Sequence, residues 1–187
     1  MTEAQDDRAF EDFYGHSFQG VFRVVVGLIG ADEAWDVTQE AFVRTWISWD
    51  RLEGDDAHMR YTIAAAVGLS RSWLRRLYVR RSRSGDLVGE AETTSSSSSS
   101  PPDLGILEGL RTLPARQREA LVLCDMYGLT APEAATILHT NPGTTRVHLS
   151  RARLRMRQFL EEDDDIRHDD VAARQSRSVH DQSGGGR

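Results

Sequence analysis

The feature that most constrains this chain is a pair of adjacent helix-start signals within residues 130–157, TAPEAATILHTNPGTTRVHLSRARLRMR. Thr130 followed three residues later by Glu133 forms a capping box, in which each side chain satisfies a free backbone amide of the first helical turn. Asn141 followed by Pro142 is a second start, because Asn caps free amides and proline at the first helical position has no amide to leave unpaired. The sequence therefore predicts a short helix, a tight turn and a longer helix.

Each of the two predicted helices has one apolar face. In the first, Ala134, Ile137 and Leu138 follow the spacing of a buried helix face, and this pattern ends before His139. In the second, small or apolar positions repeat every three or four residues, at Thr145, Leu149, Ala152, Met156 and Leu160. The other faces carry arginine, with no acidic residue between positions 141 and 160. A short helix followed by a basic one favours a helix-turn-helix that enters the DNA major groove; a solvated basic face is the alternative.

Charge is segregated along the chain, although the net charge is −6. Residues 71–83 carry six arginines and no acidic residue, whereas residues 1–60 carry 13 acidic residues against five arginines. This segregation predicts a protein that touches DNA with basic faces and another partner with acidic ones. The single cysteine, Cys124, excludes an internal disulfide and is predicted to be a buried structural thiol in an apolar run.

No segment predicts membrane insertion or export. The most apolar run, residues 21–29, is much shorter than the ~20 residues that span a bilayer and lacks the basic start and cleavage site of a signal peptide. We therefore expect a cytoplasmic protein.

The predicted fold is all-α, with two small helical domains joined by a disordered linker. Residues 84–103 have the Ser- and Pro-rich composition of such a linker, SGDLVGEAETTSSSSSSPPD. The N-terminal domain, 1–83, is predicted to contain helices at 6–28, 33–46 and 57–81, and the C-terminal domain, 104–160, helices at 104–113 and 114–127 before the helix-turn-helix. Residues 161–187 lack an apolar period and are predicted to be a disordered acidic tail. One hypothesis is that this tail folds back on Arg153 and Arg157; the alternative is that it only adds solubility.

Two segments together resemble a known family. Residues 107–160 contain LRTLPARQREALVLCDMYGLTAPEAATIL and GTTRVHLSRARLRMRQFL, which resemble region 4 of bacterial RNA polymerase sigma factors, and AWDVTQEAFVRTW at 34–46 resembles region 2. Their order, the small size and the linker in place of a middle domain resemble the extracytoplasmic-function (ECF) group of the sigma-70 family, over residues 7–160. Departures such as Met59-Arg60 and Val147-His148 lie near DNA-reading positions.

The resemblance implies a role for three groups of residues. Region 2 docks on core RNA polymerase through Asp36, Gln39 and Glu40, whose spacing keeps them near one helix face but equally fits a solvated polar face. The minus-ten element is contacted by Arg71, Arg75, Arg76 and Arg80, with a flipped base captured by the loop 48–56. Trp73 and Tyr78 could stack on an unpaired base, although Trp73 also fits a core position. The minus-thirty-five element is contacted by Thr144, Arg146, Val147, His148, Arg151, Arg153 and Arg155.

The implied function is that of a sigma factor directing promoter-specific transcription initiation. The resemblance implies no catalytic activity, no cofactor and no metal, and it implies core RNA polymerase, promoter DNA and an anti-sigma protein as partners of a chain that is monomeric when free. Two alternatives remain from the residues. One is a stand-alone LuxR-like helix-turn-helix regulator that binds duplex operator DNA, and the other is an adaptor that binds polymerase without DNA.

Overall fold

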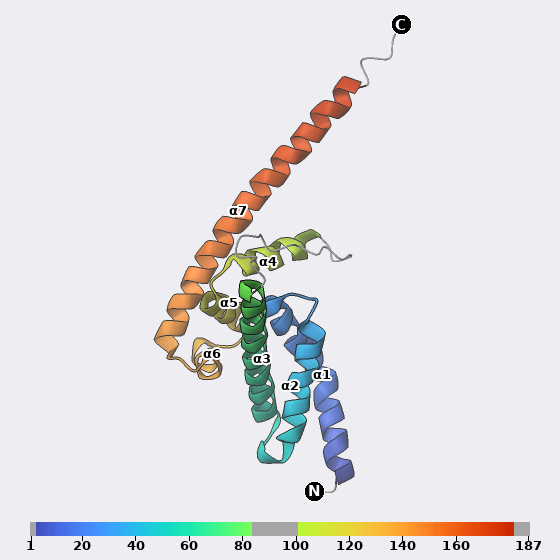
Figure 1. Cartoon of the computed structure of the whole chain (residues 1–187), viewed down its shortest axis with the longest axis vertical. Coiled ribbons are helices and arrows are strands. Elements are labelled where there is room, and N and C mark those ends of the chain that lie inside the picture. The colour runs from blue at the N-terminus through green and yellow to red at the C-terminus, as the bar shows by residue number, and fades with distance from the viewer. Residues whose placement is uncertain (1–2, 84–100, 182–187) are drawn as a thin grey trace.

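The computed structural model describes residues 3–83 and 101–181, and these residues form helices joined by short turns (Figure 1). The expected all-α fold is therefore confirmed. Most of the predicted linker, residues 84–100, lies outside the described residues, and residues 101–103 already belong to the next helix rather than to the linker. We call residues 3–83 the N-terminal half and residues 101–163 the C-terminal half.

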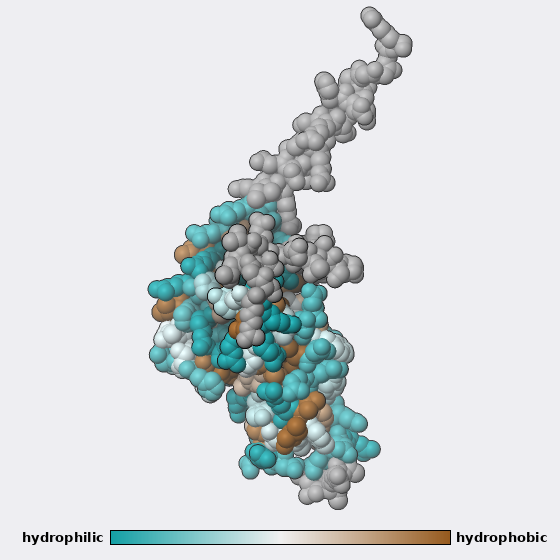
Figure 2. Space-filling view, viewed as in Figure 1, coloured by the Kyte–Doolittle hydropathy of each residue, from teal (hydrophilic) through white to brown (hydrophobic). Residues whose placement is uncertain are grey.

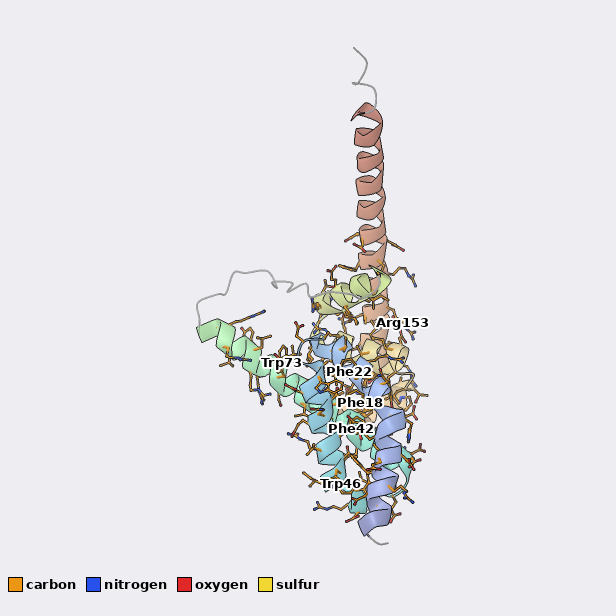
Figure 3. All side chains as sticks on the ribbon, turned by 90° about the vertical axis from the view of Figure 1, so that its right-hand side faces the viewer. Phe18, Phe22, Phe42, Trp46, Trp73 and Arg153 are labelled. Carbon is orange, nitrogen blue, oxygen red and sulfur yellow. The ribbon has the colours of Figure 1, made fainter. Side chains whose placement is uncertain are left out.

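The N-terminal half consists of α1 (Glu3–Ile29), α2 (Ala34–Ile47), a short 3₁₀ turn η1 (Trp49–Arg51) and α3 (Asp55–Arg83). Aromatic side chains fill the space between α1 and α2, with Phe18 and Phe42 stacked at a centroid distance of 6.0 Å (Figure 3). The buried hydroxyls of Thr45 and Thr62 are 2.8 Å apart and join α2 to α3. The C-terminal part of α3 projects beyond this bundle (Figure 3), which leaves its side chains available to a partner.

The C-terminal half consists of α4 (Pro101–Thr112), α5 (Ala115–Leu121), a π-helical turn η2 (Val122–Met126), α6 (Ala131–Leu138) and the start of α7 (Pro142–Asp181). Both predicted helix starts are confirmed. The Thr130 amide donates to Glu133 Oε2 at 2.8 Å within a complete capping box, and Asn141 Oδ1 accepts from the Thr144 amide at 2.8 Å. The predicted helix over 114–127 is present as α5 followed directly by η2, because the backbone widens into a π-helical turn after Leu121.

The prediction of a disordered tail from residue 161 is also wrong, because α7 continues to Asp181. The residues after Gly143 include no proline and no glycine before Gly184, so nothing ends the helix, and Asp163 and Asp170 each precede an arginine by four residues. A missing apolar period indicates that a segment is not buried; it does not exclude a helix. The straight course of α7 away from the other helices (Figure 1) also contradicts the hypothesis that the tail folds back.

The two halves pack against each other. Helix α1 contacts α4, α5 and η2, and α3 contacts α6. Buried residues of α1, such as Val24 and Leu28, belong to the same apolar cluster as Val122 and Leu123 of η2. The described residues thus form one body with a continuous core, from which the rest of α7 extends.

Candidate nucleic-acid interface

The second helix of the helix-turn-helix buries one face and exposes the basic one. Thr145, Leu149 and Ala152 are buried against the rest of the C-terminal half. Arg146, Val147, Arg151 and Arg155 are exposed, whereas Thr144 and His148 are half-buried at the edge of that face. Val147 is 47% exposed, so this face offers an apolar contact among its cations. All seven predicted minus-thirty-five residues are thus at least partly accessible on the first turns of α7, around the helix outside its buried face.

Arg153, the seventh, is held by an ion pair. Its guanidinium donates to both carboxylate oxygens of Asp125, at 2.8 and 2.6 Å, and this pairing raises the pKa of Arg153. Asp125 lies in η2, so the pair fixes α7 against the π-helical turn. Arg153 (labelled in Figure 3) therefore braces the helix, although its side chain is still 57% exposed.

The arginines of α3 likewise include some that are exposed and one that is held by an ion pair. Arg75, Arg76 and Arg80 are exposed on the projecting end of the helix, close to Tyr78, which is 69% exposed. Arg71 instead donates two hydrogen bonds to Glu119 of α5 and lies at the contact between the halves. Trp73 is neither core nor freely exposed, because it lines a cleft of about 260 Å³ between the halves.

The predicted polymerase-contact residues share one exposed face of α2. Asp36, Gln39 and Glu40 are all exposed, and Glu40 pairs with Arg44 at 2.9 Å. The same face carries four large apolar side chains, Trp35, Val43, Trp46 and Ile47, which are 51%, 50%, 39% and 68% exposed. Figure 2 shows the resulting apolar patch over the C-terminal half of α2.

This apolar patch was missed although its signal is in the sequence. The buried positions of α2 are Ala34, Val37, Thr38, Ala41, Phe42 and Thr45, which already complete one helix face. The remaining apolar residues fall on the opposite face, where Trp35 contacts Phe18 and Phe22, Trp46 contacts Phe10, and each of the four apolar side chains is still at least 39% exposed. An exposed apolar patch interleaved with acidic and amide groups is typical of a protein-binding surface.

The loop 48–56 is ordered by one stacking contact. Trp49 is buried, and its ring stacks on that of His58 at a centroid distance of 3.6 Å. The Ser48 hydroxyl donates to the Tyr61 hydroxyl at 3.0 Å. The backbone of the loop is thereby fixed to the start of α3, with Asp50 and Arg51 exposed beside it.

Cys124 is half-buried, so the predicted buried thiol is only partly sequestered. Burial, together with the neighbouring Asp125 carboxylate, raises the pKa of the Cys124 thiol, which disfavours the reactive thiolate. Across residues 3–83 and 101–181 no three His, Cys, Asp or Glu side chains are grouped as a metal ion would require. No helix in the described part of the chain is both long and apolar enough to cross a membrane.

Comparisons with known proteins agree with the sequence resemblance. Residues 104–156 match the family described as Sigma-70, region 4. The chain is 30% identical over 162 residues to the ECF RNA polymerase sigma-E factor of Escherichia coli K12, covering 79% of this chain and 84% of that protein. The corresponding factor of Salmonella typhimurium LT2 is 29% identical over the same length and coverage.

Two solved structures share the fold. The sigma factor RpoE of Bartonella quintana, solved with the anti-sigma factor NepR, superposes with a TM-score of 0.72 at 22% identity and covers 82% of this chain and 98% of its own. CnrH, solved with the cytosolic domain of CnrY, superposes with a TM-score of 0.63 at 20% identity and covers 86% of this chain and 95% of its own. The stand-alone regulator is not favoured by any of these matches. With its region 4 match and a relative at 30% identity over most of both chains, this protein belongs to the ECF RNA polymerase sigma factors, which act in transcription initiation.

Proposed function

We propose that this sigma factor binds core RNA polymerase through the exposed face of α2, reads the minus-ten element with the basic end of α3 and reads the minus-thirty-five element with the start of α7. The observation that carries the proposal is the face of α7, where Arg146, Val147 and Arg151 are exposed directly above the buried Thr145 and Leu149. The N-terminal residues of a recognition helix are the ones that reach base edges. The chain has no catalytic activity in this role and works in the cytoplasm, where the polymerase is.

At the minus-thirty-five element, four residues of α7 supply different contacts. Arg146 can donate two hydrogen bonds to the O6 and N7 atoms of guanine, and Val147 can pack against the methyl group of thymine. Arg151 and Arg155, one and two turns further along the helix, then neutralise backbone phosphates. This division of roles predicts a specific readout at the first turn of α7 and a general electrostatic contact after it.

At the minus-ten element, the exposed end of α3 combines cations with an aromatic side chain. Arg75, Arg76 and Arg80 provide positive charge for the backbone, and the exposed Tyr78 ring offers a stacking surface. Extruding a base costs a few kcal/mol, which duplex contacts by α7 would offset. Arg71 joins this surface only when it leaves Glu119.

One protein with the same fold was solved bound to an anti-sigma factor, and another was solved bound to the cytosolic domain of a second protein. We extend this to the present chain and propose that an anti-sigma protein holds it inactive, and that the free chain is a monomer. The apolar patch on α2 is accessible in the free chain and is one surface that such a protein would cover.

The decisive experiment is promoter-directed transcription in vitro with purified core RNA polymerase and this chain. Promoters are first selected from a random DNA library with the reconstituted holoenzyme, because the consensus is not given by the sequence. Specific run-off transcripts that require the chain support the proposal. Binding of the chain to operator duplex without polymerase, and without transcripts, would instead favour a stand-alone regulator.

The two roles of arginines on α7 are separable by substitution. Arg146→Ala is expected to relax the preference at one or two base pairs by ~1–3 kcal/mol, because a bidentate contact to guanine is lost. Arg155→Ala is expected to weaken binding to all sequences evenly and to flatten the salt dependence, because a phosphate contact is lost. Both are measured as holoenzyme affinity for a panel of single-base promoter variants at several salt concentrations. Identical preferences for the wild type and Arg146→Ala would remove Arg146 from the reading set.

The α2 surface is tested by a charge reversal. Asp36→Arg is expected to weaken association with core polymerase about ten-fold or more, which corresponds to ~1.4 kcal/mol, because it places a like charge against a basic partner surface. Glu11→Arg, an equal charge change at an exposed position of α1, is the matched control and should bind normally. Affinity is measured by fluorescence polarisation of the labelled chain as unlabelled core enzyme is added. Equal weakening in both variants would show a general charge effect and contradict the assigned surface.

A further inference from the structure

The cleft that Trp73 lines has a volume of about 260 Å³ and a mixed lining. Its walls come from the end of α1, the turn that follows it, the later part of α3, and α4 and α5. Leu74, Leu77 and Leu107 make part of this wall apolar. Sites for drug-sized ligands usually enclose roughly 300–1,000 Å³, so a cleft of this size suits a ligand with one ring system and one charged group.

Three arginines from three different helices line this cleft. They are Arg81 of α3, Arg111 of α4 and Arg118 of α5. The Arg111 guanidinium lies at the end of α1, because a Cβ built on Gly30 would be 3.0 Å from Arg111 Nη2. In the described part of the chain, the Arg111 side chain has neither a hydrogen bond nor an ion pair. Positive charge from separate helices is therefore gathered around one cavity.

Arg118 is the least exposed of the three arginines, and one of its donors is unused. Arg118 Nη1 donates to the Leu28 carbonyl at 2.9 Å, and Nη2 donates to the Arg111 and Leu113 carbonyls at 3.1 Å each. Its Nε is also buried, but it has no acceptor among the described residues. Burial, and then the nearby Arg111 guanidinium, lower the pKa of Arg118. An anion beside Arg111 and Arg118 would offset the repulsion between two cations that are partly withdrawn from water.

The same cleft carries an aromatic ring and two carboxylates. Trp73, labelled in Figure 3, is half-buried on α3 and offers a surface on which a base can stack. Asp32 and Glu33, in the turn before α2, are exposed, and among the described residues no ion pair joins either of them to the three arginines. Free carboxylates accept hydrogen bonds from ribose hydroxyls, and guanidinium groups bind phosphate through paired N–H donors. The lining thus offers a suitable group to each part of a nucleotide.

We propose that this cleft binds a nucleoside monophosphate. The phosphate lies between Arg111 and Arg118, and the base stacks on Trp73. The ribose hydroxyls donate to Asp32 and Glu33. A nucleoside without phosphate leaves the cations unpaired, and phosphate without a nucleoside leaves the aromatic and apolar wall uncovered, so tight binding requires both parts. None of the side chains that the proposed function assigns to polymerase or promoter DNA lines this cleft, so the site is independent of that function.

The test uses the full 187-residue chain without polymerase or DNA. The four ribonucleoside 5′-monophosphates are titrated by isothermal titration calorimetry, with the corresponding nucleosides and inorganic phosphate as probes for each part of the ligand. At least one nucleotide should bind at a single site, about ten-fold or more tightly than its nucleoside or inorganic phosphate. At about 100 times its Kd, that nucleotide should raise the melting temperature by roughly 5–10 °C, because it binds only the folded chain.

Two substitutions each remove one part of the site. Arg111→Ala removes a cation and should weaken nucleotide binding about ten-fold, so that the nucleotide binds little better than its nucleoside. Trp73→Leu keeps an apolar side chain but removes the stacking ring, and it should weaken the nucleotide and the nucleoside by a similar factor. Arg116→Ala is the matched control and should bind like the wild type, because Arg116 lies on α5 with a 57% exposed side chain and does not line the cleft. Far-UV circular dichroism establishes that each variant is folded.

The absence of saturable binding by any of the four nucleotides overturns the proposal. Binding that Arg111→Ala and Trp73→Leu leave unchanged overturns it too, because the nucleotide would then lie on one of the arginine faces of α3 or α7. If Trp73→Leu fails to fold, Arg111→Ala decides alone, since the Arg111 side chain is exposed and holds no other described residue by a hydrogen bond or ion pair. Loss of the proposed function in a transcription assay would leave this result unaffected, because the titration depends on the free chain alone.

Discussion

Deleting residues 95–100 is expected to abolish promoter-directed transcription while leaving the folded chain intact. The predicted linker of residues 84–103 reaches at most about 65 Å when fully extended, at ~3.3 Å per residue. Two promoter elements lie ~70 Å apart, a span that the widths of the two halves partly cover. Removing six residues cuts the reach to about 45 Å, so the two halves should no longer engage both elements together.

The same deletion should leave the packing between the halves undisturbed, because Arg71, Glu119 and the shared core all lie outside the linker. We therefore expect an unchanged melting temperature with loss of run-off transcripts. Replacing Ser95, Ser97 and Ser99 by glycine keeps the length and the flexible composition, and this variant should transcribe normally. Full activity of the deletion would contradict the spanning argument, since the halves would then not need the separation assumed for them.

Phe42→Ala is expected to lower stability by about 3–5 kcal/mol, the usual cost of removing a buried aromatic side chain. Phe42 is 2% exposed and contacts Tyr14 and Phe18 at centroid distances of 4.8 and 6.0 Å, so the cavity would open between α1 and α2. In a chain of this size each kcal/mol shifts the melting temperature by roughly 2–4 °C. A fall of roughly 10 °C is therefore expected by differential scanning calorimetry.

Val43→Ala is the matched control for stability, because Val43 follows Phe42 in the same helix but is 50% exposed. Its effect on unfolding should stay within about 0.5 kcal/mol. A shared core also predicts that Phe42→Ala lowers one cooperative transition, not a separate N-terminal one. A second transition at the wild-type temperature would show that the C-terminal half melts independently, and it would contradict a shared core.

Local chemistry made the helix-turn-helix predictable from the sequence. The capping box at Thr130 and Glu133 and the cap at Asn141 act within one helical turn, so their residues meet whatever the rest of the chain does. The exposed and buried faces of α7 followed from helical spacing for the same reason. The resemblance of two short segments then gave the family, which the comparison with the Escherichia coli factor bears out.

Contacts between distant residues decided the rest. Helical spacing gave Arg71, Arg75 and Arg76 the same chemistry, but only the fold separates Arg71, bound to Glu119 48 positions away, from the two arginines left exposed. Likewise, Arg153 pairs with Asp125 only because η2 packs against α7. Sequence alone determined most of the helices between residues 6 and 160, where the helix-turn-helix begins and which family the chain resembles, because those features depend on neighbours in the chain. Tertiary structure decided which charges remain available and that the halves share a core, because pairing and burial depend on which residues meet in space.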